Sequence, residues 1–453
     1  MKGNIWEQTS DEEKDSLQNE FMIEKIKERP MNKKRLIKRT ILTAAMAVIF
    51  GLIACFTFLL LEPIISKFLY PEEKAQIVVF PEDDEEMSPE EMLSDYMQQE
   101  SQLNQPPESV TGEELSMEQI NEMIRGITLS RENYKQLYYA MSHYVNSLNK
   151  SMVTITGLIS NVDWFNNVEE SKHQSFGVIV AENGKELLIL ADCEPVMDAE
   201  SLTMTLYNGV SVDAKIKEVD KDTHLGVIAV DLQVLAEHIP LDKISIAKLG
   251  TSNTQSIVGT PVVALGNPMG IGGSLGYGIV TAVMIQQDVA DTEYKFLQTD
   301  IVGSENGDGV LFNLDGEVIG MITDHRPNTD MKNMITAYGI SELKKPVEKM
   351  SNGVKMASLG ICGANVSREI NQESGVPLGA YITKVEMDSP SMLAGIQQGD
   401  VLVSINEISI SGYSEYTKAL VHLEPGQTVK IIVKRQAPDG YKDMKFEVEL
   451  GER

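Results

Sequence analysis

The chain has 453 residues, 42% of them hydrophobic, and is long enough for two or three domains that each bury a core. Its formal net charge is −28, with 67 acidic and 39 basic residues. That balance argues against nucleic-acid binding, which requires clustered Lys and Arg. The cysteines, Cys55, Cys193 and Cys362, predict no disulfide framework, and we do not expect Cys193 to pair with Cys362.

The N-terminal part predicts a membrane anchor. Residues 1–39 are polar and include eight Lys or Arg between Lys25 and Arg39. The next 22 residues, Thr40–Leu61, carry no charge and are numerous enough to cross roughly 30 Å of hydrocarbon as a helix. The basic residues before this run predict a cytoplasmic N-terminus and extracytoplasmic folded domains. Because the run is long and far from the N-terminus, we expect a single-pass plasma-membrane anchor rather than a cleaved signal peptide.

Residues 62–129 predict an acidic, disordered linker. Between Pro71 and Ser130 the chain has 16 acidic and 2 basic residues. Such a segment stays extended and solvated, with a docking function as the alternative. Residues 130–150 then predict an amphipathic helix capped by Ser130. Its apolar stripe is expected to pack on its own domain, with self-association as the alternative; the stripe comprises Tyr134, Leu137, Tyr138, Met141, Tyr144, Val145 and Leu148.

From Met152 onward the apolar residues alternate as in strands, and Gly or Asn-Gly turns separate several of the runs. The regular spacing predicts a mainly β fold, either barrels or a sandwich. A closing helix is expected at Ser341–Met350. The expected strands are Met152–Ile159, Phe176–Ala181, Glu186–Leu190, Ser201–Leu206, Val212–Val219, Gly226–Asp231, Pro261–Gly266, Gly278–Ile285, Phe296–Thr299, Val310–Asn313, Glu317–Thr323 and Ala337–Ile340.

A series of short motifs makes this region resemble the HtrA/Deg family of trypsin-like serine proteases with a C-terminal PDZ domain. The motifs are Phe176–Ile179, Asp220 with Thr223–Leu225, Gly266–Gly270, Gly278–Val280, Gln298–Asp300 and Asn313–Gly320. The resemblance assigns residues 151–350 to the protease domain and 353–450 to the PDZ domain. It implies a trypsin-like double β-barrel with a cleft between the halves, and an assembly of trimers.

The residues at the family's catalytic positions are replaced. The family's serine loop, N-P-G-N-S-G-G-P-L, is one residue shorter here. Counting back from Asn313 places Gly307 at the serine, and counting forward from Asp300 places Asp308 there; neither carries a hydroxyl. The family's T-N-x-H-V-V resembles residues 190–196 and places Glu194 at the histidine. Its T-D-L-A-V resembles residues 223–227 and places His224 at the aspartate.

This set of replacements predicts a protease fold without protease chemistry. Nucleophilic catalysis of this type requires a hydroxyl, an imidazole that takes its proton and a carboxylate that orients the imidazole. Ser304 is a poor substitute, since it precedes Gly307 by three residues, roughly 10 Å along an extended chain. The alternative is an active serine endopeptidase with a rearranged triad. Residues 324–329 would line the family's specificity pocket.

The PDZ resemblance predicts peptide binding. Ser358–Ile361 is identified as the carboxylate-binding loop, in which Leu359, Gly360 and Ile361 offer backbone N–H groups to a peptide's C-terminus. Tyr416–Leu423 would be the groove helix, and Thr428–Lys434 the last full-length strand. The expected partners are peptides or misfolded exported proteins in the cell envelope, with no nucleic acid. No cofactor or metal is expected, because the six histidines show no H-E-x-x-H spacing and no Cys-x-x-Cys is present.

Overall fold

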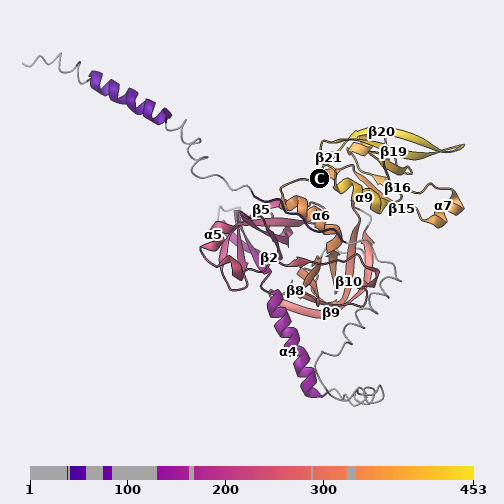
Figure 1. Ribbon diagram of the computed structural model, residues 1–453, viewed down its shortest axis with the longest axis horizontal. Coiled ribbons are helices and arrows are strands. Elements are labelled where there is room, and N and C mark those ends of the chain that lie inside the picture. Colours follow the sequence, from indigo (N-terminus) through magenta and orange to yellow (C-terminus); the bar gives the residue numbers. More distant parts are fainter. Residues whose placement is uncertain are drawn as a thin grey trace, which may run out of the picture. The chain divides into compact units, whose positions relative to one another are not determined.

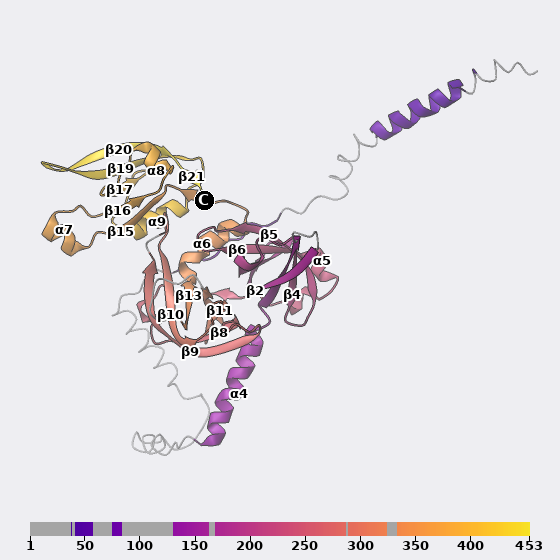
Figure 2. The same ribbon diagram turned by 180° about the vertical axis from the view of Figure 1, so that it is seen from behind.

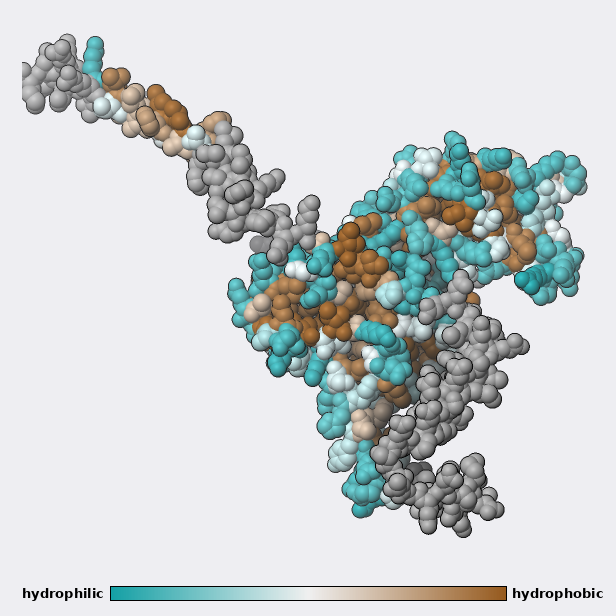
Figure 3. All heavy atoms as spheres, in the orientation of Figure 1, coloured by the Kyte–Doolittle hydropathy of each residue, from teal (hydrophilic) through white to brown (hydrophobic). Residues whose placement is uncertain are grey.

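The structure is a computed structural model that describes residues 38, 41–57, 75–83, 130–162, 168–286, 289–323 and 333–453 (Figure 1, and from behind in Figure 2). Its contacts divide the chain into two compact units, Met1–Glu72 and Glu73–Arg453. In the first unit, residues 41–57 are helical and mostly apolar (Figure 3). Within the described ranges no helix has both the length and the apolarity to cross a membrane, and the predicted span at 40–61 extends past those ranges.

The first six strands of the second unit form a closed antiparallel barrel in the order β1-β2-β3-β6-β5-β4. Alternate side chains such as Ile155 and Ile189 point inward and are fully buried. All six strands were predicted; the sequence missed the short helix α5 (Leu232–Ala236) after β6. The strands are β1 (Met152–Val162), β2 (Val168–Glu182), β3 (Glu186–Asp192), β4 (Ser201–Leu206), β5 (Ser211–Val219) and β6 (Leu225–Asp231).

A second barrel follows in the order β11-β8-β9-β10-β13-β12, and pairing of β11 with β12 closes it. The short strand β7 (Lys248–Leu249) adds in parallel to β12. The trypsin-like double barrel that the resemblance implied is therefore present. The strands are β8 (Pro261–Asn267), β9 (Ser274–Gln286), β10 (Tyr294–Val302), β11 (Asp308–Asn313), β12 (Glu317–Ile322) and β13 (Met334–Gly339).

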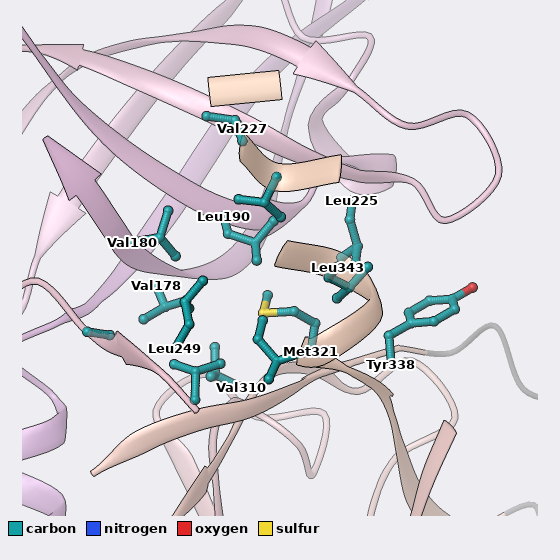
Figure 4. Close-up of a cluster of buried hydrophobic side chains, with 14 of the residues drawn as sticks. Val178, Val180, Leu190, Leu225, Val227, Leu249, Val310, Met321, Tyr338 and Leu343 are labelled. Carbon is teal, nitrogen blue, oxygen red and sulfur yellow. The ribbon is translucent and has the colours of Figure 1, made fainter. Parts of the chain in front are cut away.

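The two barrels and the closing helix α6 (Ile340–Ser351) share one apolar cluster. Leu190 and Leu225 come from the first barrel, Val310 and Met321 from the second, and Leu343 from the helix; Figure 4 shows these side chains gathered between the elements. Each of the five is at most 1% exposed. Burial of this apolar surface holds the barrels together, so the loops between them have fixed positions.

The prediction of a solvated linker is wrong for residues 75–83. Val78 and Phe80 are buried in the shared cluster, since alternate residues of this extended segment face the same side. Their backbone N–H groups donate to Asn352 Oδ1 at 3.0 Å and Glu348 Oε2 at 2.9 Å. Asp83 also pairs with Lys344 of α6. The rest of the predicted linker lies almost wholly outside the described residues.

Helix α4 (Arg131–Leu148) has the predicted cap, because the Ser130 side chain accepts from the Asn133 N–H. The prediction that its stripe packs on its own domain holds only near the C-terminal end. There Val145 and Leu148 are buried. Near the start, Tyr134, Leu137 and Tyr138 are more than half exposed, and the rings of Tyr134 and Tyr138 contact each other. The early turns of the helix therefore keep an apolar surface in solvent.

The C-terminal part forms a sheet in the order β15-β16-β17-β19-β20 (Figure 2). The prediction that Thr428–Lys434 is the last full-length strand is wrong, because β20 follows it and pairs with it in a hairpin. The sequence does carry the signal, since Met444, Phe446, Val448 and Leu450 alternate with charged residues. The elements are β14 (Ala357–Ser358), β15 (Ile361–Asn365), α7 (Arg368–Ser374), β16 (Ala380–Val385), α8 (Pro390–Ala394), β17 (Val401–Ile405), β18 (Ile408–Ser409), α9 (Tyr413–Val421), β19 (Thr428–Ala437), β20 (Gly440–Glu449) and β21 (Gly451–Glu452).

Candidate functional sites

The first site is the glycine loop between β10 and β11, at residues 303–307. Its N–H groups donate within the protein: Ser304 N to Pro268 O at 2.9 Å, and Gly307 N to Ser304 O at 3.3 Å. Asn306 N donates to Ser304 Oγ at 3.3 Å. An oxyanion hole requires N–H groups aimed at the developing charge of a substrate. In this loop the N–H groups of 306 and 307 have partners in the loop itself.

Gly307 has no room for a side chain. A Cβ at this position would lie 2.7 Å from the Pro268 carbonyl oxygen, which is closer than real Cβ contacts. Next to it, the Asp308 side chain turns into the protein, where its Oδ2 accepts from the Phe176 N–H of β2 at 2.7 Å. Burial raises the pKa of the Asp308 carboxyl, and the Phe176 N–H opposes that shift. Asp308 thus links the loop of the second barrel to a strand of the first.

The structure brings Glu194 and His224 together, and the nearest atoms, His224 Nδ1 and Glu194 Oε2, are 3.4 Å apart. Glu194 begins a 3-10 helix (Glu194–Val196) directly after β3. His224 precedes β6 in a left-handed conformation, φ 58°, and its carbonyl accepts from the Cys193 N–H at 2.9 Å. These backbone contacts hold the carboxylate and the imidazole next to each other.

A second histidine contacts a hydroxyl on the β1–β2 hairpin. Ser171 Oγ lies 3.3 Å from His173 Nε2, two residues along β2, and both side chains are solvent-accessible. The hydroxyl is also within 3.4 Å of the Ile159 carbonyl oxygen on β1. This Ser-His pair is one element of a nucleophilic site, although a hydroxyl–imidazole contact also forms readily on an exposed strand pair.

The second site is the loop before β15. Leu359 N and Gly360 N donate to one oxygen of the Asp291 carboxylate, Oδ2, at 2.7 Å each, and Ile361 N donates to Oδ1 at 3.1 Å. Gly360 has φ +82°, which turns successive N–H groups to the same side. Three consecutive amides converging on a carboxylate form an anion-binding nest. The predicted residues therefore do bind a carboxylate, and it comes from the turn before β10.

Comparisons with known proteins agree with this architecture. Residues 176–321 match the trypsin-like peptidase domain family and residues 353–450 match the PDZ domain family. The probable periplasmic serine endoprotease DegP-like of Brucella suis is 29% identical over 270 residues, 58% of this chain and 50% of that protein. The serine protease Do-like HtrA of Lactococcus lactis subsp. lactis is 24% identical over 296 residues, 60% of this chain and 69% of that protein.

The fold also agrees with a solved structure. The HtrA-type protease AlgW with decapeptide superposes with a TM-score of 0.51 at 20% identity, over 68% of this chain and 98% of that one. The chain belongs to the HtrA-type protease family. The match spans about half the length of the DegP-like relatives.

Next to the PDZ loop of this HtrA-type protein is a cavity of about 670 Å³, lined by residues that include Asp291, Tyr294, Glu342, Leu420 and Arg453. Burial raises the pKa of Glu342 to about 7, although Lys295 lies 3.5 Å away and opposes the shift. Among the described residues, no three His, Cys, Asp or Glu side chains are placed to hold a metal ion. The segment expected to line the specificity pocket, residues 324–329, lies outside the described residues.

Sequence reasoning missed three residues around the PDZ loop: Asp291, which accepts from its amides, Tyr416, whose hydroxyl donates to Asp291, and Arg453, which lines the adjoining cavity. Asp291 contacts the PDZ loop although it lies 68 residues before Leu359 in the sequence, and no local motif predicts such a contact. The weak signal that exists is a group of acidic residues, Asp288, Asp291 and Glu293, just ahead of an apolar strand. Cys193 and Cys362 are buried, and Cys55 is exposed.

Proposed function

We propose that this HtrA-type chain does not cut peptides but binds them through its PDZ domain, outside the cytoplasm, as a scaffold or sensor in protein quality control. The observation that supports this best is the loop at Gly307. Gly307 carries no hydroxyl and leaves no space for one, and the loop donates two of its N–H groups to its own atoms. A trypsin-like site requires both a nucleophile and an oxyanion hole.

The proposed equivalence of Glu194, His224 and Gly307 with the family's triad also supports a site without protease activity. A carboxylate beside an imidazole resembles half of a triad, but here the order of the two along the chain is reversed. Glu194 and His224 are held 3.4 Å apart by their backbones. Such a pair stabilises the turn before β6 and has no acyl-transfer role without a nucleophile next to it.

The PDZ loop supports peptide binding because its N–H groups already bind a carboxylate. β15 lies at the edge of its sheet, where an added strand can pair with it. The relatives are named periplasmic proteases, and AlgW was solved with a decapeptide. By analogy, the proposed ligands are peptides or unfolded exported proteins.

We also propose that residues 40–61 anchor the chain in the plasma membrane with the folded domains outside. The support is the sequence alone: an uncharged run of 22 residues behind eight basic residues. Extraction of membranes at alkaline pH should leave the chain in the pellet, whereas a chain lacking residues 1–61 should be soluble. Release of the full chain by that treatment would disprove the anchor.

The test of inactivity uses the full chain in detergent with an unfolded protein substrate and a fluorophosphonate probe. We expect no fragments and no covalent adduct. Serine-dependent cleavage, or an adduct mapped to any side chain of the cleft, would overturn the proposal.

The contact of Ser171 with His173 favours a second candidate, an active endopeptidase with a rearranged triad. If the full chain does cleave the substrate, the Ser171→Ala variant decides between the two. Loss of cleavage in that variant would assign the nucleophile to Ser171. Unchanged cleavage would place the nucleophile elsewhere and remove this candidate.

A further inference from the structure

The carboxylate of Asp291 has five hydrogen-bond donors. Three are the amides of Leu359, Gly360 and Ile361 described above. The others are side chains: Ser358 Oγ donates to Oδ2 at 2.8 Å, and the Tyr416 hydroxyl of α9 donates to Oδ1 at 2.6 Å. Hydrogen bonds to an ionised acceptor are the strong ones in proteins, and a carboxylate has room for about four or five of them. The amides of the loop and the carboxylate of Asp291 are therefore each other's hydrogen-bond partners.

The backbone of Asp291 also pairs with the PDZ domain. Its N–H donates to the Ile361 carbonyl at 2.8 Å, at the start of the edge strand β15. In strand addition, the last residue of a bound peptide supplies both a backbone hydrogen bond to the edge strand and a carboxylate to the loop. Asp291 supplies both of these, with a side-chain carboxylate in place of a chain end.

The segment around Asp291 is held on both sides. The Arg453 guanidinium lies 3.4 Å from the Ala290 carbonyl oxygen, and the Ser414 hydroxyl of α9 donates to Glu293 Oε1 at 2.7 Å. Asp291 itself is 5% exposed and has φ 62°, a conformation that few residues other than glycine adopt. Such a conformation persists when surrounding contacts impose it.

We propose that Asp291 is an internal ligand of the carboxylate-binding loop, and that the C-terminus of a partner chain binds there by displacing it. This inference rests on the proposed peptide-binding function. One loop cannot serve two carboxylates, because its amides have a single set of hydrogens and the charges repel. The apparent affinity for a peptide is therefore reduced by the fraction of molecules in which Asp291 occupies the loop.

The test compares peptide binding by the full chain in detergent with that of the variant Asp291→Asn. The probes are two pools of fluorescein-labelled decapeptides ending in apolar residues, one with a free C-terminal carboxylate and one with a C-terminal amide. Fluorescence anisotropy should show the free-carboxylate pool binding the variant at least 10-fold more tightly than the wild type. The matched control is Asp213→Asn, the same change at an exposed position of β5 in the first barrel, which should bind like the wild type.

Hydrogen exchange of the Leu359, Gly360 and Ile361 amides gives a second measurement that needs no peptide. It should be several-fold faster in Asp291→Asn than in the wild type or Asp213→Asn, while thermal melting shows that all three are folded. Equal exchange, or equal affinity of wild type and Asp291→Asn for the free-carboxylate pool, would overturn the internal ligand. Faster exchange without any preference for free carboxylates in either protein would instead disprove peptide binding by this domain, and with it the displacement.

Discussion

Two glycine loops in this chain are similar in composition but differ in where their amide N–H groups donate. The loop at 303–307 precedes β11, and the loop at 358–361 precedes β15. Both are short, contain glycine at a tightly packed position and begin a strand. In the first loop the amides of Asn306 and Gly307 donate to Ser304, whereas in the second three amides converge on a carboxylate.

The difference arises from backbone conformation and neighbours rather than composition. Gly360 has a left-handed φ of +82°, which makes an open nest of the amides around it. In the first loop the Pro268 carbonyl fills the space above Gly307 and accepts from the Ser304 N–H. A glycine-rich sequence therefore indicates an anion site only when the amides are left pointing outward. Here the PDZ loop meets that condition.

The largest effect is expected from a side chain at Gly360. A Cβ there would overlap the Ser389 Cβ, and the left-handed φ opposes a β-branched residue. Together these costs should lower the stability of the C-terminal part by about 3 kcal/mol or more in Gly360→Val. The control, Gly375→Val, has φ +67° with open space around it and should lose only the conformational part, about 1–2 kcal/mol. Equal losses in thermal melting would contradict the overlap.

The stability of the fold around the second loop should depend on pH through Glu342, which lines the same cavity as Asp291. Burial raises the folded-state pKa of this carboxyl from 4.5 to about 7. Its stabilising contribution is therefore fully present below pH 4.5 and is lost as pH rises through 7, an effect of up to about 3 kcal/mol. In Glu342→Gln this loss disappears, so the variant should gain stability relative to the wild type between pH 4 and 8. If the free energies of unfolding of the wild type and Glu342→Gln changed in parallel across that range, the raised pKa of Glu342 would be refuted.

The first loop should not regain activity when the serine is restored. Gly307→Ser places a Cβ 2.7 Å from the Pro268 oxygen and should cost about 1–3 kcal/mol, whereas Asn306→Ser, at an exposed neighbour, should change stability by less than about 0.5 kcal/mol. Even combined with Glu194→His and His224→Asp, we expect no fluorophosphonate labelling, because the amides remain directed inward. Labelling of the triple variant would show that the amides of the loop do not prevent catalysis, and that the side-chain replacements alone account for inactivity.

Sequence predicted the strands well because alternation of buried and exposed residues is local information. Counting from Asn313 or Asp300 places Gly307 or Asp308 at the family's serine, and that assignment stays a prediction. The direction in which an amide N–H points is not fixed by the neighbouring sequence. It depends on Pro268 for the first loop and on Asp291 for the second. Burial of Val78 and Phe80 was likewise hidden, because their partners on α6 lie about 270 residues away.

The smallest effect concerns the Cys193 thiol, which precedes Glu194 in the sequence and is fully buried. Burial raises its pKa to about 12, so only about one molecule in 10⁵ carries the thiolate at pH 7. Native Cys193 should resist iodoacetamide and should react after unfolding in urea; peptide mass spectrometry measures the modified fraction in each state. Rapid alkylation of Cys193 in the folded chain would mean that the thiol reaches solvent. Cys193 would then be a candidate for covalent chemistry in this part of the molecule, because a thiolate attacks carbonyl carbons without a separate base.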